Sequence, residues 1–232
     1  MSKTDSCVRL QHPPSVAPRH LPPPGEGNLR RVYHIAEADN WPSIQRDGLL
    51  SARALFERAG ARAGDRSAVE KHRAVRAVLS DGTVIRDQSP MPPSALKPCL
   101  RGLTPTQWYR LLNGKVFFWF DEDRVARHLH ACRRSAQIVL TIDAEALLAR
   151  HAARASVAPF NTGNARRKPA VRGRATFVPW TTWQVSGWRS ESDGLGTSPR
   201  PKSHKPAELA IDRAVPDVLE FVVARREVTA AV

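Results

Sequence analysis

Val32-Tyr33-His34-Ile35 is the stretch that decides how this chain folds. Its β-branched and aromatic residues predict a strand. Asp39 and Asn40 follow as candidate helix caps, and Gly48 comes where a short helix would end. A strand followed at once by a short helix marks the beginning of a folded domain near residue 30.

Short strands and helices follow along the rest of the chain. An aromatic strand is predicted over Lys115–Phe120 and another strand over Gln137–Ile142. Thr104 begins a capping box, Asp121 and Asp143 are expected to cap two further helices, and residues 67–79 are expected to be helical. There is no regular alternation of strand and helix and no glycine-rich loop after a strand, so the sequence predicts an α+β fold, with a mixed α/β fold as the alternative.

Composition divides the chain into a tail and one domain. Residues 1–29 are rich in proline and poor in large apolar residues, which predicts a disordered tail. Residues 30–228 are long enough for a single domain with a substantial core. Within that domain, 159–175 and 190–205 are expected to be basic loops, because they hold clusters of Arg, Gly, Ser and Pro.

Positive charge is the first indication of a partner. The chain has 36 Lys and Arg residues against 22 Asp and Glu, a net charge of +14. Eleven basic and two acidic residues lie between 150 and 205. Concentrated arginine favours polyanions, so we expect nucleic acid or another phosphate-rich partner. The alternative is an arginine-rich composition that forms only a solvated face.

Other classes of protein find little support. Three cysteines form neither a disulfide framework nor a paired metal motif, which favours reduced thiols in the cytoplasm. His128, His130 and Cys132 lie in a helical pattern where alternate residues point to different faces, so we expect no metal site. No apolar run is long enough for a membrane span, and no Gly-x-Ser-x-Gly nucleophile motif occurs.

A sharper pattern has three parts. The first part is Val-Tyr-His-Ile-Ala at 32–36 together with Asp-Gly-Leu-Leu-Ser at 47–51. The second is the aromatic stretch at 114–121, and the third is Pro206-Ala207-Glu208, which opens a late strand. Together they resemble the ADP-ribosyltransferase superfamily, with the closest likeness to its bacterial DarT-like branch, which modifies nucleic acid. From about 30 to 225 the chain also resembles an uncharacterised bacterial family that shares the Gly-Leu-Leu-Ser, Arg-Asp-Gln-x-x-Met and Val-Phe-Phe-Trp stretches. The resemblance implies a split mixed β-sheet with flanking helices.

The resemblance also implies NAD as co-substrate and a role for particular residues. His34 matches the histidine that holds the ribose of NAD, and Phe118 or Trp119 matches the aromatic residue that stacks on nicotinamide. Glu208 matches the catalytic glutamate. Where the superfamily has a tyrosine in the aromatic strand, this chain has phenylalanine or tryptophan, which keep the flat ring and lack the hydroxyl.

Further candidates come from neighbouring positions. Tyr33 and Ser51 belong to the same motifs and are expected to contact the cofactor. The polar loops around Arg86-Asp87-Gln88 and Asn161-Thr162-Gly163, together with Arg172, could orient phosphates or a base. The substrate-binding candidates are therefore Arg86, Gln88, Asn161 and Arg172. The alternative for these loops is ordinary turn chemistry, and for Arg172 a solvated side chain.

The residue types suit the implied chemistry. Breaking the bond between ribose and nicotinamide creates an oxocarbenium-like sugar, as in glycoside hydrolysis. A carboxylate beside the ribose stabilises that charge and can accept the proton of an incoming nucleophile. Structural explanations stay open: His34 at a strand end, core packing for the aromatic strand, and a surface carboxylate for Glu208.

Three functions follow as alternatives. The first is transfer of ADP-ribose from NAD to a nucleic-acid base or terminus, with DNA expected as the acceptor in preference to RNA. The second is a nucleic-acid-binding or nuclease-like module that uses the same fold without NAD, and the third is a protein ADP-ribosyltransferase. A partner antitoxin or hydrolase is compatible with the first.

Overall fold

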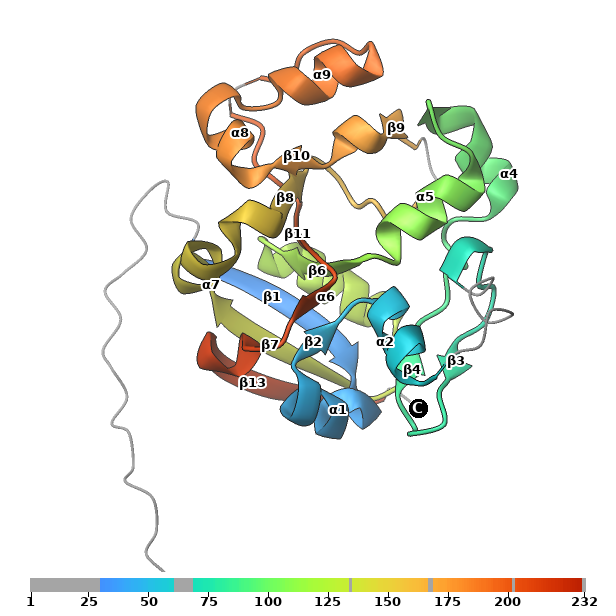
Figure 1. The fold of residues 1–232 in the computed structure, drawn as a ribbon, viewed down its shortest axis with the longest axis vertical. Coiled ribbons are helices and arrows are strands. Elements are labelled where there is room, and N and C mark those ends of the chain that lie inside the picture. The colour runs from blue at the N-terminus through green and yellow to red at the C-terminus, as the bar shows by residue number, and fades with distance from the viewer. Residues whose placement is uncertain (1–29, 61–68, 134, 167–168, 202, 231–232) are drawn as a thin grey trace, which may run out of the picture.

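A seven-stranded sheet lies at the centre of the computed structural model, which describes residues 30–60, 69–133, 135–166, 169–201 and 203–230 (Figure 1). Its strand order is β10-β8-β11-β6-β1-β7-β13. The strands are β1 (Arg31–Glu37), β6 (Lys115–Trp119), β7 (Gln137–Asp143), β8 (Ala155–Ala158), β10 (Val178–Pro179), β11 (Glu208–Asp212) and β13 (Val222–Val228). Outside it, three two-stranded sheets pair β12 (Ala214–Val215) with β2 (Leu49–Leu50), β3 (Ala77–Val78) with β4 (Val84–Ile85), and β5 (Leu100–Arg101) with β9 (Arg172–Gly173). The predicted tail at 1–29 lies outside the described residues.

Helices surround this sheet. They are α1 (Trp41–Asp47), α2 (Ala52–Arg58), α4 (Pro93–Leu96), α5 (Pro105–Leu112), α6 (Glu122–Ala131), α7 (Ala144–His151), α8 (Trp180–Ser186) and α9 (Arg189–Leu195). Single turns of 3₁₀ helix are η1 (Ala38–Asn40), η2 (Lys97–Cys99), η3 (Ala152–Arg154), η4 (Arg174–Thr176) and η5 (Val218–Glu220). None of the helices in the described part of the chain has the length and apolar character of a membrane span.

The predicted α+β class is confirmed. The sheet differs from the predicted mixed one, because each pairing between its strands is antiparallel. Among the described residues a parallel pairing occurs only outside this sheet, between β5 and β9. Along the order β10-β8-β11-β6-β1-β7-β13, each strand runs in the direction opposite to its neighbours. Strands that run the same way are therefore always separated by another strand.

Local signals position several helices as predicted. Thr104 accepts a hydrogen bond from the backbone of Gln107, and the Gln107 side chain accepts one from the backbone of Thr104, which completes the capping box of α5. Asp121 and Asp143 cap α6 and α7 through their carboxylates. α5, α6 and α7 therefore each begin directly after the residue that caps them.

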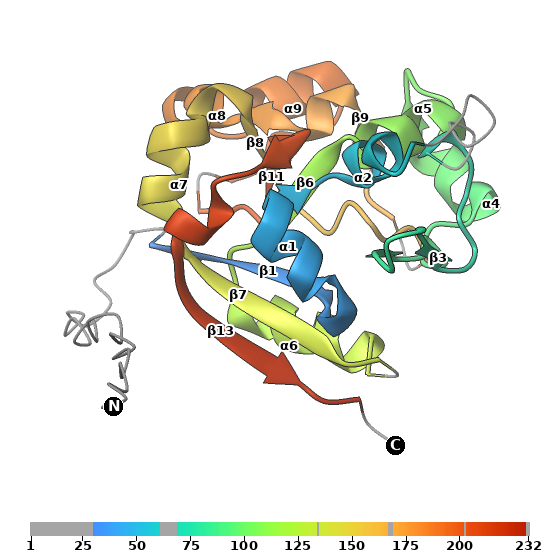
Figure 2. The same cartoon turned by 60° about the horizontal axis from the view of Figure 1, so that its bottom comes forward.

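Alternation along β1 divides the core between two faces of the sheet. Val32 and Ala36 point to the larger core, which α1 and α7 cover through Ile44 and Leu147. Tyr33 and Ile35 point to the other face, where α6 packs against them through Val125. Figure 2 shows α1 and α7 on one side of β1 and β7, with α6 on the other. Each helix thus buries its apolar stripe against one sheet face.

The sheet is split between β1 and β6. β1 pairs with β7 along its whole length, whereas it pairs with β6 only at Tyr33 and Trp119. On the face that α6 covers in one half, the other half is covered by α5 through Trp108 and Tyr109. Divergence of two central strands, with different helices on either side, leaves an opening at the middle of the sheet.

The helix predicted at 67–79 is wrong for most of its length. The described part is helical only at 69–70, and β3 begins at Ala77. The backbone of Arg73 bonds to Gln88 instead of to its own segment: Gln88 N donates to Arg73 O at 2.6 Å, and Arg73 N donates to Gln88 Oε1 at 3.2 Å. The Arg73 side chain adds a bond from Nε to Arg86 O at 2.7 Å. These long-range bonds replace helical ones, so local propensity does not decide this segment.

The basic loop predicted at 190–205 is helical at its start, where α9 ends at Leu195. Glu191 is fully buried and accepts two hydrogen bonds of 3.0 Å from Arg200. A side chain at Gly194 would lie 2.6 Å from Cβ of Ala175, so this glycine permits close packing of α9 on η4. Gly194 is therefore explained by close helix packing and does not mark a flexible loop.

Gly48 is expected to be irreplaceable at the end of α1. Its φ is +70°, and a Cβ there would lie 2.4 Å from Val215 O. We expect Gly48→Ala to destabilise the protein by more than about 1 kcal/mol, as measured by urea unfolding. Gly82→Ala is the matched control, since Gly82 also has positive φ but no atom within 4 Å of its Cβ position. Equal losses in both variants would contradict a role for the close approach.

Candidate active site

A cavity of about 310 Å³ lies at the split between β1 and β6. His34 and Val116 line it from one sheet face, and Ile35 and Phe117 line it from the other, so it enters the opening between the strands. This volume is at the lower end of the range of small-molecule sites. Six predicted site residues line the cavity: His34, Arg86, Gln88, Trp119, Asn161 and Glu208.

Glu208 opens β11 directly opposite Trp119 of β6, so both side chains point to the same face. Its side chain is buried, with 4% of the residue exposed. Thr162 donates to Glu208 Oε2 from its backbone N at 3.2 Å and from Oγ1 at 2.7 Å. Burial raises the pKa of Glu208 to about 7, while the Thr162 hydrogen bonds and the charges of Arg124 and Arg172 act in the opposite direction. Glu208 can therefore exchange a proton near neutral pH.

His34 presents one ring nitrogen to the protein. Its Nδ1 lies 2.8 Å from the carbonyl oxygen of Phe117. A carbonyl only accepts hydrogen bonds, so Nδ1 carries the proton, and burial lowers the pKa of His34 to about 4. The imidazole is neutral at physiological pH. Its Nε2 is then a hydrogen-bond acceptor, which suits a ligand hydroxyl.

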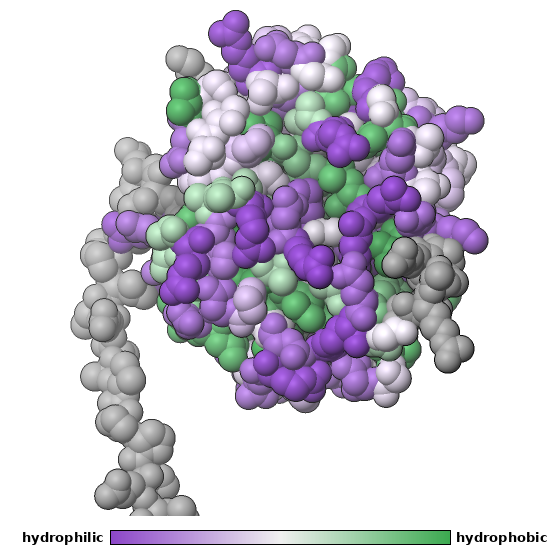
Figure 3. Space-filling model, in the orientation of Figure 1, coloured by the Kyte–Doolittle hydropathy of each residue, from purple (hydrophilic) through white to green (hydrophobic). Residues whose placement is uncertain are grey.

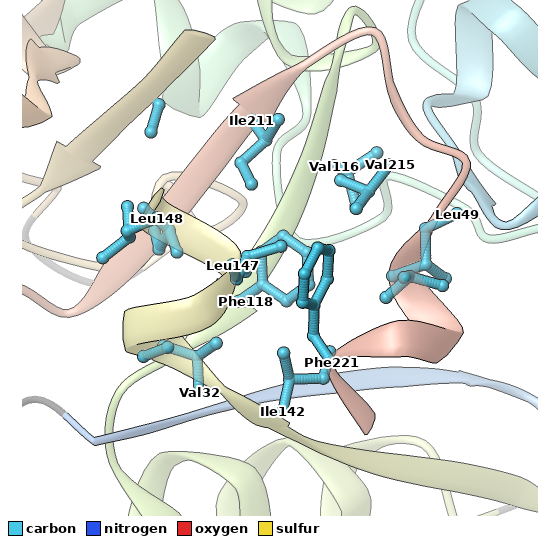
Figure 4. Close-up of a cluster of buried hydrophobic side chains, with 14 of the residues drawn as sticks. Val32, Leu49, Val116, Phe118, Ile142, Leu147, Leu148, Ile211, Val215 and Phe221 are labelled. Carbon is cyan, nitrogen blue, oxygen red and sulfur yellow. The ribbon is translucent and has the colours of Figure 1, made fainter. Parts of the chain in front are cut away.

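The aromatic strand divides its two candidate residues. Trp119 lines the cavity and lies 5.9 Å from the ring of His128. Phe118 points to the opposite face, where it is fully buried and absent from the cavity lining. Figure 4 shows Phe118 close to Leu147 and Phe221 inside the large core. The geometry therefore supports Trp119 as the stacking candidate and gives Phe118 a structural position.

Tyr33 and Ser51, the other cofactor candidates, also lie outside the cavity lining. The Tyr33 hydroxyl donates to Glu122 at 2.5 Å, on the face that α6 covers, so it ties α6 to β1. The Ser51 hydroxyl accepts from the backbone of Ala54 and caps α2. Both side chains are used by the fold, because strand alternation and helix capping direct them away from the cavity.

Arg86 lines the cavity from within a hydrogen-bond network. Its Nε donates to Glu37 at 3.0 Å, and its Nη2 donates to Gln137. Its Nη1 lies 2.6 Å from Nε2 of His128, which must accept, since guanidinium nitrogens only donate. Burial and, to a smaller extent, the charge of Arg86 lower the pKa of His128 to about 4. Arg86 thus joins β1, β7 and α6 at the cavity wall.

Gln88 and Asn161 line the cavity with amides that already have protein partners. Gln88 Oε1 accepts from the backbone of Arg73 at 3.2 Å, and its Nε2 donates to Asn113 at 3.3 Å. Asn161 Oδ1 accepts from the backbone of Gly163 at 2.9 Å, as in an Asx turn. Both amides form part of the cavity wall. The Asn161 contact also agrees with the alternative of turn chemistry that the sequence left open.

Arg172 does not line the cavity, although the sequence suggested a substrate contact. It is almost fully buried, with 1% exposed. Its Nη1 donates to Thr162 O at 3.1 Å, and its guanidinium lies 5.0 Å from the ring centre of Phe160. Arg172 therefore supports the loop that carries Thr162. Burial in an aromatic environment, where a guanidinium packs on ring faces, separates it from solvent.

Sequence reasoning missed the role of Thr162, although the Asn-Thr-Gly loop was noted. It also missed Lys115, which lines the cavity and donates to Asp212 at 2.5 Å, and Asn113, whose amide joins Gln88 to Val69 O. No sequence signal predicts that Thr162 contacts a residue 46 positions later. Among the described residues, no cluster of His, Cys, Asp and Glu has an arrangement that could hold a metal ion.

Burial of Glu208 predicts a distinctive pH dependence of stability. Between its ordinary pKa of 4.5 and the folded value of about 7, the folded state retains a proton that the unfolded state releases. Rising pH therefore lowers the free energy of unfolding through this group, by about 3 kcal/mol in total. Glu208→Gln should lose this decrease, so the variant gains stability relative to wild type between pH 5 and 8, as measured by urea unfolding.

The comparison with Glu208→Gln isolates this effect. His34 and His128, with pKa values lowered to about 4, act oppositely and add stability as pH rises to 6.5. They are present in both proteins, so their contribution cancels in the difference. Parallel stability profiles for the two proteins would contradict a raised pKa at Glu208.

Fold and site together define an α+β protein with a split antiparallel sheet and a carboxylate, a neutral imidazole and an indole around one cavity. A profile of the family of unknown function DUF7002 matches residues 30–222, and the chain belongs to this family. That span agrees with the predicted likeness to an uncharacterised family.

Comparison with solved structures finds a chain described as "Thermosipho africanus DarTG in complex with ADP-ribose". The TM-score is 0.39 and the sequence identity is 13%. The alignment covers 84% of this chain and 43% of the other, so this chain spans less than half of that protein's length. Comparison with curated protein sequences finds no match.

Proposed function

We propose that this protein transfers ADP-ribose from NAD to a nucleic-acid base or terminus, with Glu208 as the catalytic residue. One observation carries the proposal: His34, Trp119 and Glu208, from strands β1, β6 and β11, line the same cavity. The resemblance in sequence gave these three residues their roles, and it required them to meet. His34 and Glu208 lie more than 170 positions apart in the sequence, so no local interaction brings them together.

The three side chains suit the reaction. The Trp119 indole offers a flat face for nicotinamide, and neutral His34 offers Nε2 to a ribose hydroxyl. The bond between ribose and nicotinamide breaks with both electrons leaving on the nicotinamide nitrogen. The acceptor atom then bonds to the same ribose carbon, and its proton passes to the Glu208 carboxylate. The negative charge of Glu208 stabilises the positive sugar between these events.

The charge of the chain supports a nucleic-acid acceptor. The net charge of +14 favours a polyanion, and Arg166 places an exposed cation beside the cavity loops, with its Nε donating to Ser89 O at 3.0 Å. Figure 3 shows hydrophilic side chains over much of one face, with apolar side chains between them. A hydrophilic surface on a chain of net charge +14 suits phosphate contacts better than an apolar partner.

Transfer of label tests the proposal. The wild type and Glu208→Gln are incubated with NAD labelled in its adenosine half, together with separate DNA, RNA and protein pools. We expect label in the DNA or RNA pool with wild type and none with the variant. Absence of label from every pool, together with no NAD binding by calorimetry, would refute the transferase.

The same experiment separates the alternatives. Label confined to the protein pool would identify a protein ADP-ribosyltransferase. A nucleic-acid-binding module without NAD chemistry would bind DNA with an affinity that falls steeply with salt, and Glu208→Gln would not change that affinity. The charge of the chain favours this second candidate equally, so NAD consumption is the deciding measurement.

A further inference from the structure

Thr162 contacts only one oxygen of the candidate catalytic carboxylate. Its backbone N and its hydroxyl both donate to Glu208 Oε2, at 3.2 and 2.7 Å. Among the described residues, no donor binds Oε1. Thr162 is itself buried, with 1% exposed, and it lines the cavity beside Glu208. The two oxygens of this carboxylate are therefore not equivalent: one is held by the protein, and the other is left for a ligand.

The loop that carries Thr162 is fixed from behind. Arg172 Nη1 donates to Thr162 O at 3.1 Å, and Arg172 Nε donates to Ala170 O at 3.1 Å. The guanidinium also packs on the rings of Phe160 and Trp108, with its central carbon 5.0 and 5.8 Å from their centres. A buried arginine that donates two hydrogen bonds holds the Thr162 backbone in place, so the two Thr162 donors point at Glu208 before any ligand binds.

Other charges near Glu208 do not make this contact. Arg124 of α6 and Arg172 of β9 favour its charged form through space, and neither forms a hydrogen bond with it. Thr162 alone supplies direct donors among the described residues. Loss of its hydroxyl therefore removes a directional contact and leaves these more distant charges unchanged.

We propose that Thr162 is the positioning residue of Glu208: by binding Oε2 through two donors, it directs Oε1 toward the substrate. The catalytic meaning of this inference rests on the proposed function, in which Oε1 faces the reacting ribose and receives the acceptor's proton. Arg172 supports Thr162 and does not touch the substrate. This assignment replaces the direct substrate contact that the sequence suggested for Arg172.

The test compares Thr162→Val, which removes the hydroxyl, with Thr162→Ser, which keeps it. Protein labelled with ¹³C at the glutamate carboxyl carbon is titrated by NMR, and Glu208→Gln identifies the Glu208 resonance. A hydrogen bond to a charged group stabilises that charge, so Thr162→Val should raise the pKa of Glu208 by about 1 to 2. Thr162→Ser should leave it at the wild-type value.

Activity gives an independent measurement. The midpoint of the profile of kcat against pH for NAD turnover should move upward in Thr162→Val with the NMR value, and KM should change less than kcat. Thermal melting followed by circular dichroism checks folding, and Thr162→Ala replaces the valine variant if that variant does not fold. A merely structural role would not move the pH midpoint and would not distinguish serine from valine.

Each outcome separates this inference from the proposed function. An unchanged pKa of Glu208 in folded Thr162→Val or Thr162→Ala overturns the positioning role, even if wild type consumes NAD. A raised pKa that serine restores supports it. If the Thr162 variants show that pattern and wild type does not consume NAD, the proposed function fails while the positioning of Glu208 stays supported.

Discussion

Glu208→Gln is expected to lower kcat for NAD turnover by roughly 10³-fold, the size of effect usual for a catalytic acid–base or charge-stabilising group. Glutamine keeps the shape of the side chain and the contact from Thr162, and it loses the negative charge. Affinity for NAD should fall much less than kcat, because charge matters most when the sugar becomes positive. Stopped-flow single turnovers and calorimetry measure the two quantities separately.

Glu145→Gln is the matched control for this prediction. Glu145 is an exposed residue in the first turn of α7, outside the cavity lining. Its substitution should leave turnover at the wild-type level. The pH dependence provides a second check: with the pKa of Glu208 at about 7, wild-type turnover should rise as pH increases through 7. Turnover that survives in Glu208→Gln would remove this residue from the mechanism.

Substitutions of the neighbouring residues Phe118 and Trp119 are expected to have different effects: the first lowers stability, and the second weakens NAD binding. Phe118 is fully buried in the large core, so Phe118→Ala should lower the free energy of unfolding by about 3–5 kcal/mol. Trp119 lines the cavity and is partly buried. Trp119→Leu should raise KM for NAD by about 3- to 10-fold through loss of stacking, with a smaller loss of stability. Urea unfolding and initial rates measure both.

The pair tests the assignment that strand alternation provides. If Phe118→Ala folds with wild-type stability, its side chain is not in the core. If Trp119→Leu leaves KM unchanged, stacking on the indole is not part of NAD binding. Phe118→Leu serves as a milder variant, because it keeps most of the apolar volume and should retain activity as well as folding.

Several features were predictable because their signals are local. Thr104, Asp121 and Asp143 cap helices through hydrogen bonds to backbone groups two or three residues away, so the sequence placed the starts of α5, α6 and α7. The strands around His34 and Trp119 were recognisable from their β-branched and aromatic residues. Segments decided by distant contacts were not predictable, as 67–79 and α9 show.

The candidate site shows the same division. His34, Trp119 and Glu208 could be selected from motifs, and their residue types suit the chemistry proposed for them. Their meeting in one cavity depends on the registers of β6 against β1 and β11, which no single segment encodes. Register also decides that Trp119 and not Phe118 lines the cavity, since a shift by one residue exchanges the two faces.

For this protein, the sequence by itself determined the α+β class, the helix caps and the three residues around which a site could form. Only the tertiary structure decided the split between β1 and β6, the buried position of Arg172 and the contact of Thr162 with Glu208. The physical reason is range. Capping and strand propensity act within a few residues, whereas burial, sheet register and the partner of a buried carboxylate are properties of the packed chain.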